Sequence, residues 1–108
     1  MTKRAAITAL VGSIAIATAA GAQTVDPSIG RRLAETVCSE CHQIDVGSPP
    51  GSNPAAPSFV DISRMPSMTE LAIKVFLRSP HPHMPDIILS PEEIDSIAAY
   101  SVGLAQAH

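Results

Sequence analysis

Apolar residues recur every three or four positions in three stretches of the chain, which is the spacing of an amphipathic helix. No segment alternates between apolar and polar residues as a half-buried strand does. The sequence therefore predicts an all-α fold made of several short helices. The positions expected to be buried are, in chain order, Ile29, Leu33, Ala34 and Val37, then Leu71, Val75, Phe76 and Leu77, then Ile94, Ile97, Ala98, Ser101 and Leu104, with Tyr100 adjacent.

Capping residues mark where these helices begin. Asp26 is a suitable N-cap for the first helix, and Pro27 fits the first helical position because its missing N–H has no partner there anyway. Capping boxes, in which a Glu follows a Ser N-cap by three residues, begin the other two helices at Ser67 and Ser90. We expect the second helix to end before Pro80.

Prolines and glycines shape the segments between the helices. Residues 47–54 are Gly, Ser, Pro and Asn without periodicity, which is typical of a loop. Residues 80–85 read Pro-His-Pro-His-Met-Pro. Each residue before a proline is disfavoured in a helix, so we expect this second segment to be extended.

The first 22 residues have the pattern of an export signal. Lys3 and Arg4 form a charged start, residues 5–20 are apolar or small, and Ala20-Gly21-Ala22 fits a cleavage site. A membrane anchor is the less favoured alternative, because a spanning helix needs ~20 predominantly apolar residues. We therefore expect a signal peptide at residues 1–22, cleaved after Ala22, one domain at residues 23–108, and a periplasmic location.

Cleavage would make the chain more acidic. Without Lys3 and Arg4, five of the seven basic residues remain against ten acidic ones, a net charge of −5 with neutral histidines. No basic patch suited to nucleic acid is visible. An acidic surface favours instead a protein partner with a positively charged docking face.

Cys38-Ser39-Glu40-Cys41-His42 is a C-x-x-C-H motif, the attachment pattern of c-type haem. Two thiols at this spacing can form thioethers with the two vinyl groups of one porphyrin, and His42 can then bind the iron. A dithiol redox pair would need a thioredoxin-like βαβ setting, and a zinc site would need a second pair of ligands. A disulfide across two residues would constrain little of the chain. The motif therefore predicts one covalent haem c.

A bound haem also fits the size of the domain. The chain has no Trp, and its aromatic residues are Phe59, Phe76 and Tyr100. Domains this small usually need a cross-link or a bound group to complete their core. We therefore expect the chain without haem to be poorly folded.

The second iron ligand must come from the remaining methionines and histidines. Met84 is favoured because the prolines around it keep it out of a helix, and methionine with histidine is a known ligand pair for haem iron. Met65 and Met68 are expected to fill gaps in the core. His108 is expected to be a solvated chain end.

His81 and His83 are the alternatives to Met84. In a polyproline-like segment with three residues per turn, His81 and Met84 would point the same way, so one could replace the other. Without that role, both histidines are expected to be solvated near the haem edge.

Taken together, these residues resemble the single-haem class of small soluble bacterial cytochromes c, over nearly the whole expected mature chain. Gly30, eight residues before Cys38, is similar to the family's N-terminal-helix glycine, which lets another helix cross closely. Ile97 and Tyr100 are similar to the C-terminal-helix positions that pack across that glycine.

A second part of the resemblance concerns the histidine of the motif. Ala56-Pro57-Ser58-Phe59 resembles the family's G-P-x-L stretch. The resemblance implies that the carbonyl of Pro57 accepts the N–H of His42, and that Phe59 lies against the porphyrin.

The function expected from these features is periplasmic electron transfer. Two strong ligands, His42 and Met84, would leave no open position on the iron, so we expect an electron carrier and not an enzyme. We expect a monomer that exchanges electrons with other redox proteins, without nucleic acid, and on a membrane only if the signal segment is uncleaved. The alternatives are a haem enzyme or gas sensor with a displaceable distal ligand, and a cytochrome subunit of a dehydrogenase or oxidase complex.

Overall fold

The computed structural model describes residues 2, 7, 9–17 and 25–107. Regular structure in these residues is helical throughout, which confirms the predicted all-α class. α1 (Pro27–Leu33) continues into a π-helical turn (Ala34–Cys38), and α2 (Phe59–Arg64), α3 (Glu70–Arg78) and α4 (Pro91–Ala107) follow. α2 was not predicted, because a helix of six residues is too short to show a period.

Parts of the predicted export signal lie outside the described residues. These parts are residues 1, 3–6, 8 and 18–22, which include Lys3, Arg4 and the cleavage site, and His108 is also outside. The signal peptide and its cleavage therefore stay predictions. In the described part of the chain, no helix is both long enough and apolar enough to cross a membrane.

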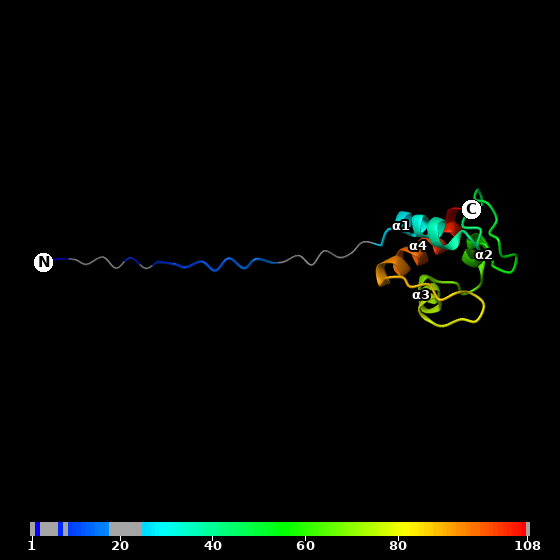
Figure 1. Ribbon diagram of the computed structural model, residues 1–108. Helices are drawn as coiled ribbons and strands as arrows, with labels where there is room; N and C mark the ends of the chain where they lie inside the picture. The colour runs from blue at the N-terminus through cyan, green and yellow to red at the C-terminus, as the bar shows by residue number, and fades with distance from the viewer. Residues whose placement is uncertain (1, 3–6, 8, 18–24, 108) are drawn as a thin grey trace.

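α4 is the helix on which the others pack. It contacts α1, α2 and α3, and Figure 1 shows it between α1 and α3. Its start is the predicted capping box, since Ser90 Oγ accepts from Glu93 N at 3.2 Å and Glu93 Oε2 accepts from Ser90 N at 2.7 Å. The residues predicted to face inward are all buried: Ile94, Ile97, Ala98, Tyr100, Ser101 and Leu104.

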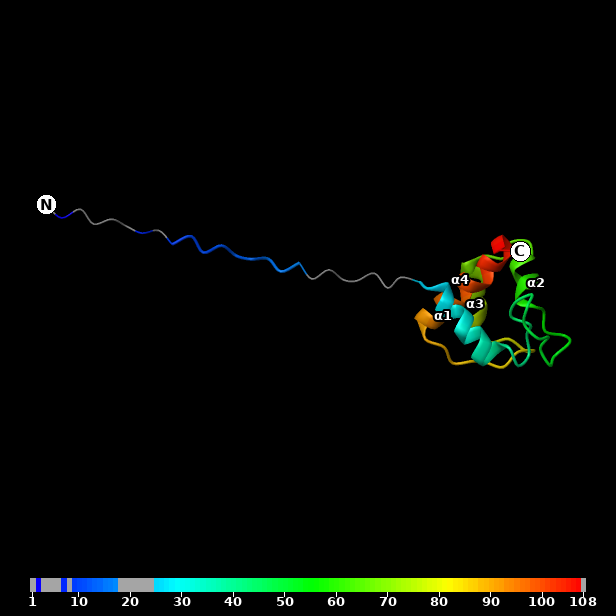
Figure 2. The same cartoon turned by 90° about the horizontal axis from the view of Figure 1, so that it is seen from above.

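α1 crosses α4 closely, in both views of the molecule (Figures 1 and 2). A Cβ atom at Gly30 would overlap the backbone carbonyl of Ser96, so the crossing requires a residue without a side chain. Asp26 caps α1 as predicted, with its carboxylate 2.8 Å from Ser28 N. The glycine crossing is the one implied by the family resemblance.

The buried face of the first helix differs from the predicted one. Gly30 and Ala34 are buried, whereas Ile29 and Val37 are 39% and 37% exposed. The close crossing explains the difference, because it selects the smallest side chains for the contact with α4. Ile29 and Val37 are turned away from α4, whereas Leu33 is half-buried and packs against the core as predicted.

α3 begins later than predicted. Ser67 has a φ of 65°, in the left-handed region, which prevents the extended conformation of an N-cap. Thr69 caps the helix instead, and its Oγ1 accepts from Ala72 N at 3.1 Å. The predicted capping box at Ser67 was therefore wrong.

The buried face of α3 is also narrower than predicted. Ile73 is buried and Leu77 packs against the core, but Leu71, Val75 and Phe76 are 68%, 56% and 50% exposed. α3 packs against α4, and the exposed residues lie outside this contact. The core itself lies where α4 meets the end of the first helix and α2, and it contains Ala34, Cys38, Ile44, Phe59, Val60, Ile97, Tyr100 and Leu104.

Candidate haem-binding site

The C-x-x-C-H motif begins in the π-helical turn that ends the first helix. The N–H of Ser39 donates to the carbonyl of Ala34, the wider spacing of a π turn. The N–H groups of Cys41 and His42 then both donate to the carbonyl of Cys38, at 3.2 Å and 2.9 Å. These bonds close a compact turn that carries both cysteines and the histidine.

Cys38 and Cys41 are free thiols in different surroundings. Cys38 belongs to the core and is 9% exposed, and this burial raises the pKa of its thiol to about 11. Cys41 is half-buried. Cys38 is therefore a protonated thiol at neutral pH.

His42 is oriented by a backbone carbonyl. Its Nδ1 lies 2.7 Å from the carbonyl oxygen of Pro57. A carbonyl can only accept, so Nδ1 carries the proton and Nε2 keeps its lone pair. Metal-binding histidines are usually held in this way. The hydrogen bond implied by the family resemblance is present.

α2 brings Pro57 and Phe59 against the motif. Ser58 caps the helix by accepting from Asp61 N at 3.0 Å, and Phe59 N donates to the carbonyl of Gln43 at 2.9 Å. The ring of Phe59 is 6% exposed and meets the imidazole of His42 edge to face, with 5.6 Å between ring centroids. Phe59 therefore packs directly beside the predicted ligand.

The loop at residues 47–54 presses on the motif from another side. Ser52 N donates to the carbonyl of Glu40 at 2.8 Å. A Cβ atom at Gly51 would overlap the backbone carbonyl of Cys41. Sequence reasoning missed Gly51, because a glycine in a proline-rich loop is an ordinary turn residue and gives no separate signal.

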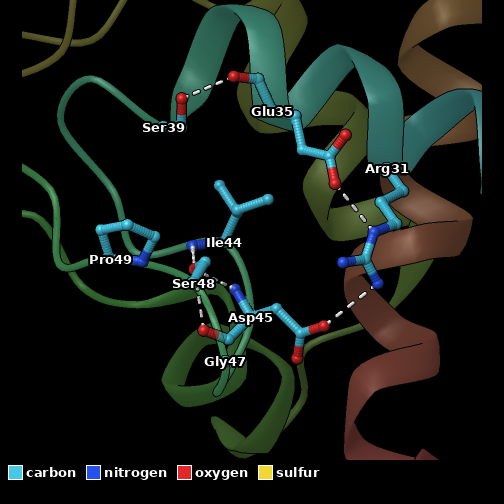
Figure 3. A pocket seen from close by; sticks show the side chains of 8 residues that line it. All are labelled: Arg31, Glu35, Ser39, Ile44, Asp45, Gly47, Ser48 and Pro49. Atoms are coloured by element: carbon cyan, nitrogen blue, oxygen red, sulfur yellow. Dashed lines mark hydrogen bonds and ion pairs between the residues drawn. The ribbon is translucent and has the colours of Figure 1, made fainter.

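A pocket of about 440 Å³ lies beside the motif but holds none of the predicted site residues. Figure 3 shows Arg31 in it, between Glu35 at 2.9 Å and Asp45 at 3.2 Å. Ser48 Oγ accepts from the N–H groups of Ile44 and Asp45 on its floor. The charge of Arg31 is balanced by these two carboxylates. The ion pair with Asp45 connects α1 to the segment after the motif.

Met84 lies in the segment between α3 and α4, drawn in yellow in Figure 1. The chain bends at residues 82–84, so the segment is not extended throughout as predicted. Met84 is half-buried and forms no hydrogen bond or ring contact within the described part of the chain. Met65, expected in the core, is 41% exposed, and Met68 is half-buried.

The two histidines near Met84 are not alike. His83 is exposed, as expected for a solvated residue. The side chain of His81 is only 9% exposed, and its ring stacks on Phe76 with 4.4 Å between centroids. The expectation that His81 is solvated was therefore wrong, because Phe76 packs against it.

The residues present fit a covalently bound haem. Two free thiols and an imidazole with an available Nε2 share one turn. The thioether of Met84 stands on a separate loop and forms no hydrogen bond with the described residues. These are the donors that two vinyl bonds and two axial positions require.

The chain is similar to a cytochrome c-552 of Bradyrhizobium diazoefficiens. The two are 37% identical over 79 residues, which make up 73% of this chain and 75% of the other protein. No protein-family profile matches the chain, and no solved structure matches it.

Proposed function

The chain belongs to the cytochrome c family, and we propose that it is an electron-transfer protein carrying one covalent haem c. When bound, the haem supplies an iron that accepts and returns one electron. The proposed axial ligands are His42 and Met84. The strongest support is the 2.7 Å contact between His42 Nδ1 and the carbonyl of Pro57, which leaves Nε2 for a metal.

The proposed attachment uses Cys38 and Cys41. Each thiol would add its sulfur to one vinyl carbon and its hydrogen to the other, so the two thioethers form without an oxidant. The raised pKa of Cys38 keeps its hydrogen in place at neutral pH. The hydrogen-bonded turn at Cys38 holds the backbone of both cysteines and of His42 together.

The proposed distal ligand is Met84. It is half-buried, whereas Pro82, His83 and Pro85 beside it are exposed. A thioether ligand raises the reduction potential relative to two histidines. With both axial positions taken, the protein would exchange electrons without binding substrate, and we propose no enzymatic activity.

We further propose that the protein works as a monomer in the periplasm. The expected export signal and the acidic charge of the remaining chain support this. Among the acidic residues, Glu40 of the haem motif and Glu92 at the start of α4 are exposed, and Glu93 is half-buried. Redox partners with a positively charged docking face would therefore associate fastest at low salt.

The test is the absorption spectrum of the oxidised, haem-loaded protein. We expect the weak far-red band of sulfur-to-iron(III) charge transfer, and its loss in Met84→Ala. Met65→Ala and Met68→Ala are matched controls that keep the band. A haem-loaded protein without this band at neutral pH would refute thioether ligation.

Two further measurements separate the other functions. Rapid CO binding by the reduced wild-type protein would indicate a haem enzyme or gas sensor. Stoichiometric co-purification with a dehydrogenase or oxidase would indicate a cytochrome subunit of such a complex.

A further inference from the structure

His81 is held in the same way as His42. His81 Nδ1 lies 2.6 Å from the carbonyl oxygen of Ser79, as His42 Nδ1 lies 2.7 Å from that of Pro57. The carboxylate of Asp86 lies 3.9 Å from the same Nδ1, beyond hydrogen-bond distance. In the neutral form of both imidazoles, Nδ1 therefore carries the proton and Nε2 has the lone pair, which is the tautomer that binds metals.

The lone pair of His81 is not used inside the protein. The side chain is 9% exposed, and Nε2 is buried without a hydrogen-bond partner among the described residues. Buried nitrogen atoms nearly always have a partner. A rearrangement that gives His81 Nε2 a partner is therefore favoured.

Burial along the loop sets His81 and Met84 apart from their immediate neighbours. His81, Met84 and Ile87 are half-buried, whereas the residues between them are exposed. One residue in three therefore faces inward, although the chain bends at residues 82–84. His83, directly beside Met84, faces outward.

The loop is also free to change shape. No backbone-to-backbone hydrogen bond in the described part of the chain involves residues 80–89. His81 itself is held by the ring of Phe76 and by the carbonyl of Ser79, at the end of α3. A rearrangement of the loop would therefore break few bonds.

We infer that His81 is a reserve ligand, which takes the distal position on the iron when Met84 leaves it. This inference rests on the proposed function. Nε2 is covered by protein in the present arrangement, so its binding requires the loop to move. The exchange replaces the bond from Met84 sulfur with one from His81 Nε2.

The test uses the haem-loaded Met84→Ala protein, oxidised and at neutral pH. We expect a low-spin spectrum, because His81 fills the position that Met84 has left. Met84→Ala/His81→Phe should be high-spin, since phenylalanine keeps the stack on Phe76 but has no nitrogen. Met84→Ala/His83→Ala is the matched control and should stay low-spin.

Added imidazole provides a second measurement on the same proteins. It must displace His81 in Met84→Ala but not in Met84→Ala/His81→Phe. We expect its apparent affinity to be at least about tenfold higher in the double variant, because the open iron is then fully available. Equal affinities would overturn the inference.

Other results would also overturn it. These are a high-spin Met84→Ala protein, and a low-spin one that His83→Ala or His108→Ala converts to high-spin while His81→Phe does not. A failure of the proposed function looks different, because the far-red band would already be missing from the wild-type protein. With that band present, a high-spin Met84→Ala protein refutes only the reserve ligand.

Discussion

The hydroxyl of Tyr100 donates a hydrogen bond to the backbone carbonyl of Ile44, at 2.8 Å and across 56 positions of the chain. Ile44 lies two residues after His42. Both partners are buried, with Ile44 2% and Tyr100 7% exposed. α4 therefore holds the segment that leaves the haem motif. We therefore expect the loss of this hydrogen bond to disturb the position of His42, the proposed iron ligand.

Replacing Tyr100 by phenylalanine should weaken the fold. The carbonyl of Ile44 would lose its buried donor, which costs about 1–2 kcal/mol of unfolding free energy. Denaturant unfolding of the haem-loaded protein measures this cost. Ser79→Ala removes an exposed hydroxyl that donates to the carbonyl of Val75 at the end of α3, and should change the free energy of unfolding by less than about 0.5 kcal/mol. Equal values for wild type and Tyr100→Phe would contradict the role of this bond.

The same residue should make stability depend on alkaline pH. Burial, followed by the negative charge of Asp45, raises the pKa of Tyr100 above its ordinary value of 10.0. The folded protein thus keeps the phenol proton where the unfolded chain loses it, so the contribution is complete below about pH 10. It should be lost as pH rises through the folded pKa. Unfolding of wild type and Tyr100→Phe should show their difference shrinking over this range, and a constant difference would refute it.

Alanine at Gly30 should destabilise the protein despite its better helix propensity. Its Cβ would overlap the carbonyl of Ser96, so α1 and α4 must move apart, at about 1–3 kcal/mol. Gly103, in α4, has open space around it and is the matched control. Gly103→Ala should raise the free energy of unfolding by about 0.5–1 kcal/mol. The same sign of change in both variants would contradict the close crossing.

Alanine at Gly51 should disturb the haem motif itself. Its Cβ would overlap the carbonyl of Cys41, so the loop or the motif has to shift. We expect a displaced far-red band and lower stability. Gly47 has nothing within contact distance, and Gly47→Ala should leave both properties unchanged. An unchanged spectrum in Gly51→Ala would show that the motif does not depend on this contact.

Loss of the thioether should lower the reduction potential. Axial ligands set haem potentials over a range of ~0.8 V, and we expect Met84→Ala to shift the potential downward by on the order of 0.1 V. Potentiometric titration of the two proteins measures the difference. Met65→Ala, at an exposed position, is the control. An unchanged potential in Met84→Ala would reject Met84 as a ligand.

Much of the fold could be predicted because the signals are local. Asp26 and the Ser90–Glu93 pair cap their helices through bonds within three residues. The buried side of α4 could be read from its period, because this helix is long and contacts each of the others. The prediction failed at Ser67, because Ser67 itself is left-handed and Thr69 caps the helix instead.

The sequence by itself determined the all-α class and the grouping of Cys38, Cys41 and His42, because five consecutive residues contain the whole motif. Only the tertiary structure decided which face of α1 is buried, where Gly51 presses on the motif, and that His81 lies under Phe76. Each of these depends on which distant segment packs against the residue. The local sequence shows which chemistry a residue can perform, and the packing of the chain decides which residues it contacts.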